Sequence, residues 1–176
     1  SGAKGFFESA TISSDGSYVT VKPLLNCPHG ESYAIVYNAP QEDTESGQYL
    51  VFKYRVPSTN PEELAFMEFY LSTINGIATG GDNIRLTPIQ DGEWHVMVFD
   101  LEAFGLASFT PADDGTFAAR FLRLDAFGTV TPETTHMDIA YVAMNDSLDE
   151  IKEFCADIES IQLATGYGAV ENIPTK

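Results

Sequence analysis

Charged and aromatic residues occur in pairs, two positions apart, within three apolar segments of the chain. The pairs are Lys53 and Arg55, Glu68 and Tyr70, and Arg123 and Asp125. Residues two apart on a β-strand point to the same side of it. An aromatic ring can pack on the apolar face of a pyranose, and planar polar groups can hydrogen-bond its hydroxyls. If the three strands are neighbours in one concave sheet, these residues form a charged cleft suited to a sugar.

The same charges also have a plainer interpretation. They could form cross-strand ion pairs on a solvated sheet surface, where each pair contributes little to stability. The residues concerned are Arg55, Glu68, Arg123 and Asp125. Both interpretations remain open at the level of the sequence.

Trp94, the one tryptophan of the chain, is a further candidate for stacking on a ligand. However, it shares its strand parity with Val96 and Val98, which favours packing of the ring at the end of the core. The opposite face of this segment is unusually apolar, which predicts that the C-terminal helix covers it. That face carries His95, Met97 and Phe99.

Carboxylate pairs raise the alternative of a glycosidase, which needs two such groups about 5–9 Å apart in a cleft. Glu68 with Asp125, or Asp100 with Asp138, would be candidates. With 26 acidic residues, however, such pairs are easy to find. The sequence has no G-x-S-x-G, H-E-x-x-H, P-loop or Gly-rich dinucleotide motif. We therefore expect no enzymatic activity.

The candidate residues lie on segments with period-two alternation, which is typical of half-buried strands. In residues 48–56 one face carries Leu50, Phe52, Tyr54 and Val56, and the other Tyr49, Val51, Lys53 and Arg55. Further strands are predicted at residues 17–23, 32–38, 64–73, 94–101, 118–125 and 136–144. So many strands between turns predict an antiparallel β-sandwich or barrel.

One short helix is predicted after the last of these strands. Ser147 and Glu150 have the spacing of a capping box. Apolar residues then repeat at helical spacing, namely Leu148, Ile151, either Phe154 or Cys155, and Ile158. The acidic residues of this stretch fall in the first turn, where the helix dipole favours them, so capping is preferred over a metal site. Residues 165–176 are expected to form a loop or a short edge strand.

The composition bounds the remaining possibilities. A length of 176 residues predicts a single domain, residues 1–176, with its core at about 8–160. With 44% hydrophobic residues the chain can build a large core. A net charge of −17 argues against nucleic acid and anionic lipid as partners. No apolar run is long enough for a membrane helix, so no membrane insertion is expected. Cys27 and Cys155 could pair or remain free.

Several segments, taken in order, resemble a known kind of module. They are YLVFKYRVP, FMEFYLST, DGEWHVMVFDL, FLRLDAFG and MDIAYVAMNDSLDEI. The resemblance is to the carbohydrate-binding-module-like (galactose-binding-like) β-jelly-roll domains of extracellular proteins from gut and rumen Firmicutes. It covers roughly residues 17 to 155 and implies an antiparallel β-sandwich of jelly-roll type, with residues 8–18 as the entering strand. It also implies a non-catalytic module that binds a polysaccharide or glycan. A spacer, adhesin or other protein-interaction domain without a small ligand is the alternative.

The resemblance also implies an extracellular or cell-surface location within a larger protein. Its other domains would then be partners. A structural calcium ion is a further implication, and the acidic segments 41–45 and 113–115 could supply oxygen ligands. Plain solvated turns are the alternative for both segments. The ligand-binding residues expected from the sequence are Arg55, Glu68, Tyr70, Trp94, Arg123 and Asp125.

Overall fold

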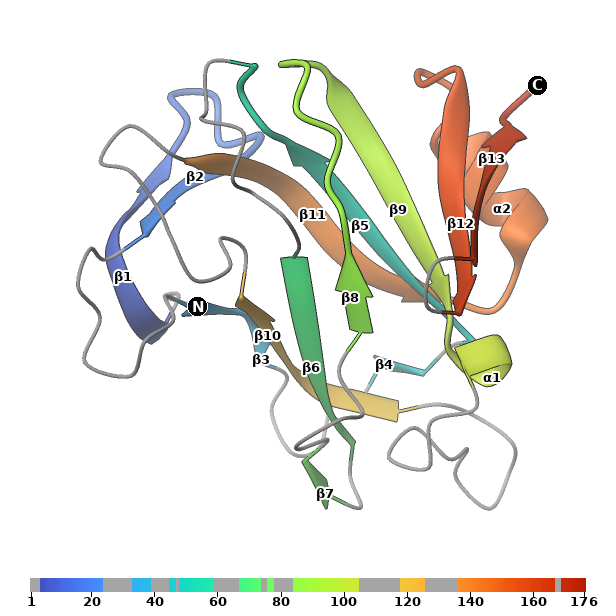
Figure 1. Ribbon diagram of the computed structural model, residues 1–176, viewed down its shortest axis with the longest axis horizontal. Helices are drawn as coiled ribbons and strands as arrows, with labels where there is room; N and C mark the ends of the chain where they lie inside the picture. Colours follow the sequence, from blue (N-terminus) through green and yellow to red (C-terminus); the bar gives the residue numbers. More distant parts are fainter. Residues whose placement is uncertain are drawn as a thin grey trace.

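Strands dominate the part of the chain that the computed structural model describes, and two short helices accompany them (Figure 1). The described backbone covers residues 4–23, 33–38, 45–46, 48–58, 67–73, 76–77, 84–104, 118–125, 136–166 and 169–176. Side chains are described at residues 9–22, 48–58, 87–103, 136–166 and 169–176.

One sheet, called here the β5 sheet, holds both central strands predicted around residues 48–56 and 94–101. Its order is β13–β12–β9–β5–β11–β2. The strands are β2 (Val19–Pro23), β5 (Tyr49–Arg55), β9 (Trp94–Asp100), β11 (Met137–Asn145), β12 (Ser160–Gly166) and β13 (Ala169–Pro174).

The second sheet, called here the β10 sheet, contains the order β3–β10–β6–β7, with β4 beside β10 and β8 beside β6. The strands are β3 (Tyr33–Asn38), β4 (Glu45–Ser46), β6 (Met67–Thr73), β7 (Gly76–Ile77), β8 (Ile84–Leu86) and β10 (Ala118–Asp125).

A single strand, β1 (Lys4–Ile12), links the two sheets. Its first residues pair with β3, and its later residues pair with β2. The register shifts between Phe7 and Ser9, at the point where the strand passes from one sheet to the other. Irregularities of this kind let a strand bend around the corner of a sandwich.

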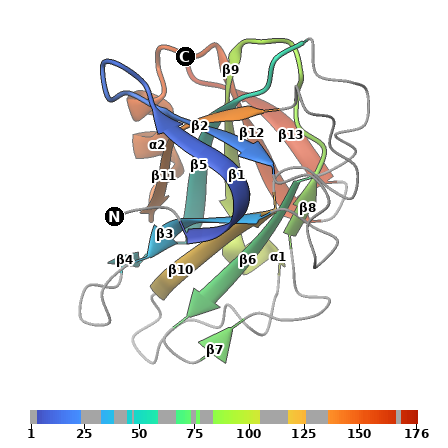
Figure 2. The same ribbon diagram turned by 90° about the vertical axis from the view of Figure 1, so that its left-hand side faces the viewer.

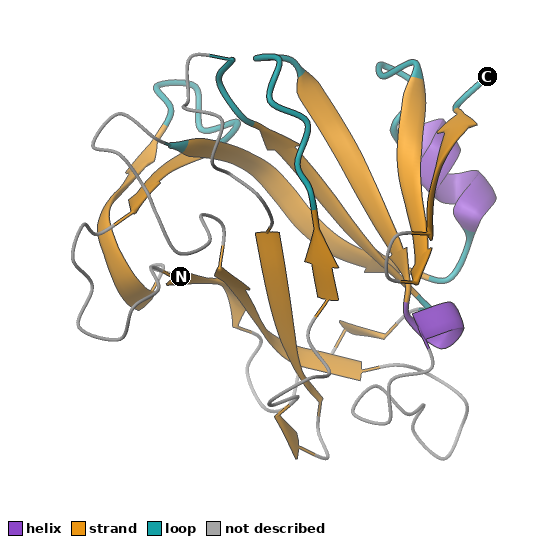
Figure 3. Ribbon diagram, in the orientation of Figure 1, coloured by secondary structure: helices purple, strands orange, loops and turns teal. Residues whose placement is uncertain are grey.

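The predicted all-β sandwich with a short helix is confirmed (Figure 3). Pairing is antiparallel throughout the described strands except between β12 and β9, which run parallel. The helix is not the last element, because a hairpin of β12 and β13 follows it. Of the two alternatives predicted for residues 165–176, the structure therefore has an edge strand.

The core between the sheets contains the predicted apolar face of β5. Leu50, Phe52 and Tyr54 are buried and lie opposite Phe99, Met97 and His95 of β9. The Tyr54 hydroxyl accepts a hydrogen bond of 3.0 Å from the backbone N–H of Ile89, just after β8. This face of the β5 sheet therefore looks toward β8 and the β10 sheet (Figure 1).

Helix α2 (Leu148–Phe154) packs on the other side of the β5 sheet, away from β8 (Figure 2). Its Ile151 and the adjacent Cys155 join a buried cluster. The partners in the sheet are Val51, Val96, Val98 and Ile161. The prediction that the helix covers the face with His95, Met97 and Phe99 is therefore wrong, because that face lines the interior of the sandwich.

The predicted start of the helix is confirmed, and its predicted end is wrong. Ser147 Oγ accepts a hydrogen bond of 3.3 Å from the N–H of Glu150, as in a capping box. The N–H of Ser147 donates instead to Asn145 Oδ1, at 2.7 Å. The helix ends at Phe154, and Ile158 belongs to a following turn in which its N–H bonds the carbonyl of Cys155.

Candidate functional site

Aromatic and cationic side chains gather on the outer side of the β5 sheet, beside α2. Lys53 and Arg55 lie on one side of β5, with Trp94 of β9 opposite Arg55 and Tyr141 of β11 opposite Lys53. Tyr18 precedes β2, and Phe154 is the last residue of α2. We call these six residues the outer strip: Tyr18, Lys53, Arg55, Trp94, Tyr141 and Phe154.

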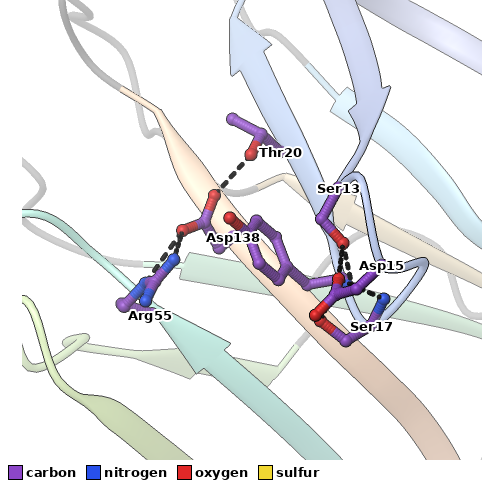
Figure 4. A network of polar contacts seen from close by, with 7 residues as sticks. Ser13, Asp15, Ser17, Thr20, Arg55 and Asp138 are labelled. Carbon is purple, nitrogen blue, oxygen red and sulfur yellow. Dashed lines mark hydrogen bonds and ion pairs between the residues drawn. The ribbon is translucent and has the colours of Figure 1, made fainter.

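Arg55 is held by a buried carboxylate on the next strand. Its Nε and one terminal nitrogen donate to Asp138 Oδ2 at 2.9 and 2.5 Å. Thr20 Oγ1 donates to the other oxygen, Oδ1, at 2.6 Å, so Arg55 and Thr20 reach Asp138 from opposite sides (Figure 4). The side chain of Asp138 is only 6% exposed, and that of Arg55 is 29% exposed. Two charge-assisted hydrogen bonds therefore fix the guanidinium on this face, and the third, from Thr20, holds the carboxylate that accepts them.

Two rings pack on the same guanidinium. Arg55 Cζ lies 4.5 Å from the centroid of the Trp94 ring and 5.1 Å from that of Tyr18. The two rings meet at 5.6 Å with an interplanar angle of 63°. Partial burial acts to lower the pKa of Arg55. The hydrogen bond and the charge of Asp138, together with a smaller contribution from Tyr18, outweigh this effect, so the pKa of Arg55 is raised above its ordinary value.

The turn between β1 and β2 sets the position of Tyr18. Asp15 Oδ1 accepts hydrogen bonds from Ser13 Oγ and Ser17 Oγ, both at 2.7 Å, and from the N–H of Ser17 at 3.0 Å (Figure 4). Gly16 has φ of +74°, a conformation that favours glycine. The hydroxyls of Ser13 and Ser17 lower the pKa of Asp15 to about 2. Ser13 Oγ also accepts from the N–H of Tyr18, at 3.1 Å.

Lys53 connects the two halves of the outer strip. Its Nζ lies 6.0 Å from the Trp94 ring centroid and 5.9 Å from that of Tyr141. It donates to Asp157 Oδ2 at 2.9 Å, and that carboxylate is 64% exposed. The hydrogen bond from Lys53 lowers the pKa of Asp157.

Tyr141 and Phe154 form the far end of the outer strip. Their ring centroids are 5.3 Å apart at an interplanar angle of 64°. The Tyr141 hydroxyl lies 3.2 Å from Cys155 Sγ, and burial raises the pKa of this phenol. Phe154 is 69% exposed. At this end of the outer strip Tyr141 thus packs against the buried cluster, while Phe154 faces solvent.

The structure separates the six predicted ligand-binding residues into two sets. Arg55 and Trp94 lie together in the outer strip. The other four are in the β10 sheet, where Tyr70 pairs in register with Arg123 and Glu68 with Asp125. The structure describes only the backbone at those four positions. The premise that all these strands are neighbours in one sheet is wrong, because β11, β2, β1 and β3 lie between β5 and β10.

Sequence reasoning missed several members of the site. Asp138, the partner of Arg55, is 83 residues away in the chain, so no local pattern connects the two. Tyr141 reaches the outer side because β11 shifts register between Ile139 and Tyr141, which breaks the alternation. Phe154 was predicted only as one of two alternatives for the apolar side of the helix. The structure gives that role to Cys155, which is fully buried.

The two carboxylate pairs that were candidates for a glycosidase site lie in different parts of the fold. Asp100 and Asp138 lie opposite Tyr49 and Arg55, at the two ends of β5. At about 3.3 Å per residue this places them roughly 20 Å apart, too far for a glycosidase pair. Asp100 instead accepts from Gln48 Nε2 at 3.0 Å and from the N–H of Ala103 at 3.1 Å. Glu68 and Asp125 are register partners, described as backbone only.

Cys155 is a free, buried thiol, and Cys27 lies outside the described residues. Within the described part of the chain, no group of three or more His, Cys, Asp or Glu is placed to hold a metal ion. The acidic segments 41–45 and 113–115 have no described side chains. None of the described helices is long and apolar enough to cross a membrane.

Comparisons with known proteins give little beyond this geometry. No family model and no curated protein matches the chain. Among solved structures it is similar to one titled "Structure of PfGH50B", at 11% sequence identity and a TM-score of 0.46. The match covers 83% of this chain and 22% of that one, so the chain spans about a fifth of its length. A likeness this distant supports no conclusion about function.

Proposed function

We propose that this domain is a non-catalytic carbohydrate-binding module whose ligand lies on the outer strip. The observation that carries the proposal is that four aromatic rings gather on the outer side of the β5 sheet, where they contact one another in pairs and surround two cations. Rings offer apolar surface to the C–H face of a sugar, and ammonium or guanidinium groups donate hydrogen bonds to its hydroxyls. A surface made only of paired charges would offer no apolar ring surface to the sugar.

The described contacts suggest distinct roles along the outer strip. Trp94 and Tyr18 provide ring surface, and Arg55 holds both rings while Asp138 holds Arg55. Lys53 has three N–H donors, of which one bonds Asp157, so it can also donate to a hydroxyl. In this proposal Glu68, Tyr70, Arg123 and Asp125 belong to the other sheet and are not part of this surface.

The second candidate is a spacer or protein-interaction domain without a small ligand. One observation favours it: Phe154 exposes 69% of its surface, and exposed rings are also enriched in protein interfaces. Such a domain would engage the outer strip with another protein instead of a sugar. In both cases we propose an extracellular or cell-surface setting within a larger protein, as the resemblance of the sequence implies.

A glycan array with the purified domain tests the proposal directly. We expect binding to at least one plant, mucin or microbial glycan, and loss of that binding in Trp94→Ala. Ile12→Ala is the control, because Ile12 is a large apolar residue, 69% exposed, that lies outside the outer strip. Each variant is checked for an unchanged melting temperature.

The array is run with calcium and again with a chelator. Loss of binding in chelator alone would assign a role to the acidic segments 41–45 and 113–115. Silence across the whole array, with a folded protein, would contradict carbohydrate binding and favour the protein-interaction candidate.

A further inference from the structure

Strand β13 forms an uncovered edge of the β5 sheet. It comes last in the strand order, and among the described strands it pairs only with β12 (Figure 1). Every residue of β13 is exposed except Ile173, which is half-buried. An uncovered strand edge offers free backbone N–H and C=O groups to another chain.

One hydrogen bond shows which backbone groups of β13 point outward. The N–H of Thr175, just after β13, bonds the carbonyl of Glu159, just before β12, at 3.1 Å. In an antiparallel pair the backbone groups of successive residues point alternately toward the neighbouring strand and away from it. The register with β12 is regular from Val170 to Pro174. The backbone groups of Val170, Asn172 and Pro174 therefore point away from β12.

The residue types along β13 agree with this assignment. Pro174 has no N–H, and proline is tolerated on an edge strand where that N–H would face solvent. The free donors are therefore the N–H groups of Val170 and Asn172. Glu171 lies between these two residues, and none of the ion pairs formed by described residues involves it.

The charge of this edge opposes pairing with a second copy of the chain. Two antiparallel β13 strands use all of their free donors only when Val170 of each copy pairs with Asn172 of the other. In that register the two Glu171 side chains lie directly opposite each other, where like charges are destabilising. The net charge of −17 on each copy adds repulsion at longer range.

We infer that β13 binds an extended segment of a partner protein, which adds a strand to the β5 sheet and places a lysine or arginine opposite Glu171. The backbone groups of Val170 and Asn172 supply the hydrogen bonds, and the side chains supply the selectivity. Val170 is 39% exposed, so a β-branched apolar residue opposite it gains burial. In antiparallel pairing, a segment such as Thr-Lys-Val places Thr opposite Asn172, Lys opposite Glu171 and Val opposite Val170.

This edge is separate from the outer strip. Strand β12 lies between β13 and β9, the strand that carries Trp94. Strand addition at β13 is therefore independent of the proposed function, and either can fail without the other.

NMR titration of the isotope-labelled domain with a synthetic peptide tests the inference. The probe is acetyl-Thr-Thr-Lys-Val-Thr-amide, and the matched probe has Glu in place of Lys. The Lys probe at millimolar concentration should shift the amide signals of Val170 and Asn172 most strongly and slow their exchange with solvent. It should bind about fivefold or more tightly than the Glu probe, because opposite charges then face each other across the strands.

Two variants separate the position of the charge from its amount. Glu171→Lys should reverse the preference between the probes. Glu153→Lys makes the same change of charge at an exposed position of α2, away from the edge, and should keep the wild-type preference. Both variants are checked for an unchanged melting temperature.

Several results would overturn the inference: no shift at Val170 and Asn172, equal affinity for the two probes, or equal effects of the two variants. A wild-type dimer with protected amides at Val170 and Asn172 would also overturn it, because a second copy would then occupy the edge. The proposed function is tested separately, by the glycan array and Trp94→Ala.

Discussion

Two ion pairs lie on the same face of β5, and they differ in how deeply their carboxylates are buried. Arg55 and Lys53 are two residues apart, and each contacts Trp94 and a tyrosine. The partner of Arg55 is Asp138, whose side chain is 6% exposed and which also accepts from Thr20. The partner of Lys53 is Asp157, whose side chain is 64% exposed.

This contrast assigns the two cations different tasks. Removing water from Asp138 is costly, so its hydrogen bonds must all be kept, and they fix Arg55 and its rings in place. Asp157 remains hydrated, so exchanging its bond to Lys53 for a bond to a ligand costs little. The Arg55 pair therefore builds the surface, and the Lys53 pair is the part of it that can adapt.

The largest effect should come from breaking the buried pair. Asp138→Ala leaves Arg55 mostly buried without its carboxylate, and we expect a loss of about 3 kcal/mol in the free energy of unfolding. Urea unfolding followed by circular dichroism measures it. The double variant Arg55→Met, Asp138→Leu should recover much of the loss, because an apolar pair leaves no charge unpaired. A cost below about 1 kcal/mol for Asp138→Ala would contradict the structural role of the pair.

Removing the third hydrogen bond should have an intermediate effect. Thr20→Val deletes the donor to Asp138 Oδ1 while keeping a similar shape, and we expect a loss of about 1.5–2 kcal/mol. Thr165→Val, at an exposed position of β12, is the matched control and should change stability by less than about 0.5 kcal/mol. Equal effects of the two substitutions would show that Thr20 does not support Asp138.

The pair whose carboxylate is exposed, Lys53 with Asp157, should contribute less than the pair whose carboxylate is buried. Asp157→Ala removes the partner of Lys53, and we expect a change below about 1 kcal/mol in the free energy of unfolding. The same urea titration, repeated in high salt, should show an even smaller difference because salt screens exposed charges. A loss as large as that of Asp138→Ala would remove the distinction between the two pairs.

The smallest effect concerns the turn that places Tyr18. The pKa of Asp15 is about 2 in the folded protein, against an ordinary value of 3.8. The stability this provides is fully present above pH 3.8 and is lost as the pH falls toward 2. Ser13→Ala should raise the pKa of Asp15, measured by NMR titration of its carboxyl group, and flatten the acid limb of stability. An unchanged pKa in Ser13→Ala would contradict the assigned hydrogen bond.

Local sequence was sufficient to predict several strands, because strand-forming residues there are bounded by turn residues. Residues 118–125 were predicted as a strand, and β10 has these bounds. The buried face of β5 also follows from Leu50, Phe52 and Tyr54 at alternate positions. Ser147 gave a local signal for the start of α2, since a cap depends on residues close in sequence.

Long-range partners could not be predicted in the same way. Val51 was placed on the polar side of its strand, yet α2 covers it, and nothing within the strand indicates where a helix packs. The separation of Arg55 from Tyr70 and Arg123 depends on how β1 joins the two sheets, which is a property of topology. The outer strip combines side chains from five segments, and only the fold brings them together.

The fluorescence of Trp94 offers the most direct test of the central claim, that the ligand site is the outer strip. Because Trp94 is the only tryptophan, its emission reports on this surface alone. Titration with the glycan recognised on the array should shift or quench that emission with the same Kd as calorimetry gives. Calorimetric binding with unchanged emission would place the ligand elsewhere and contradict the account.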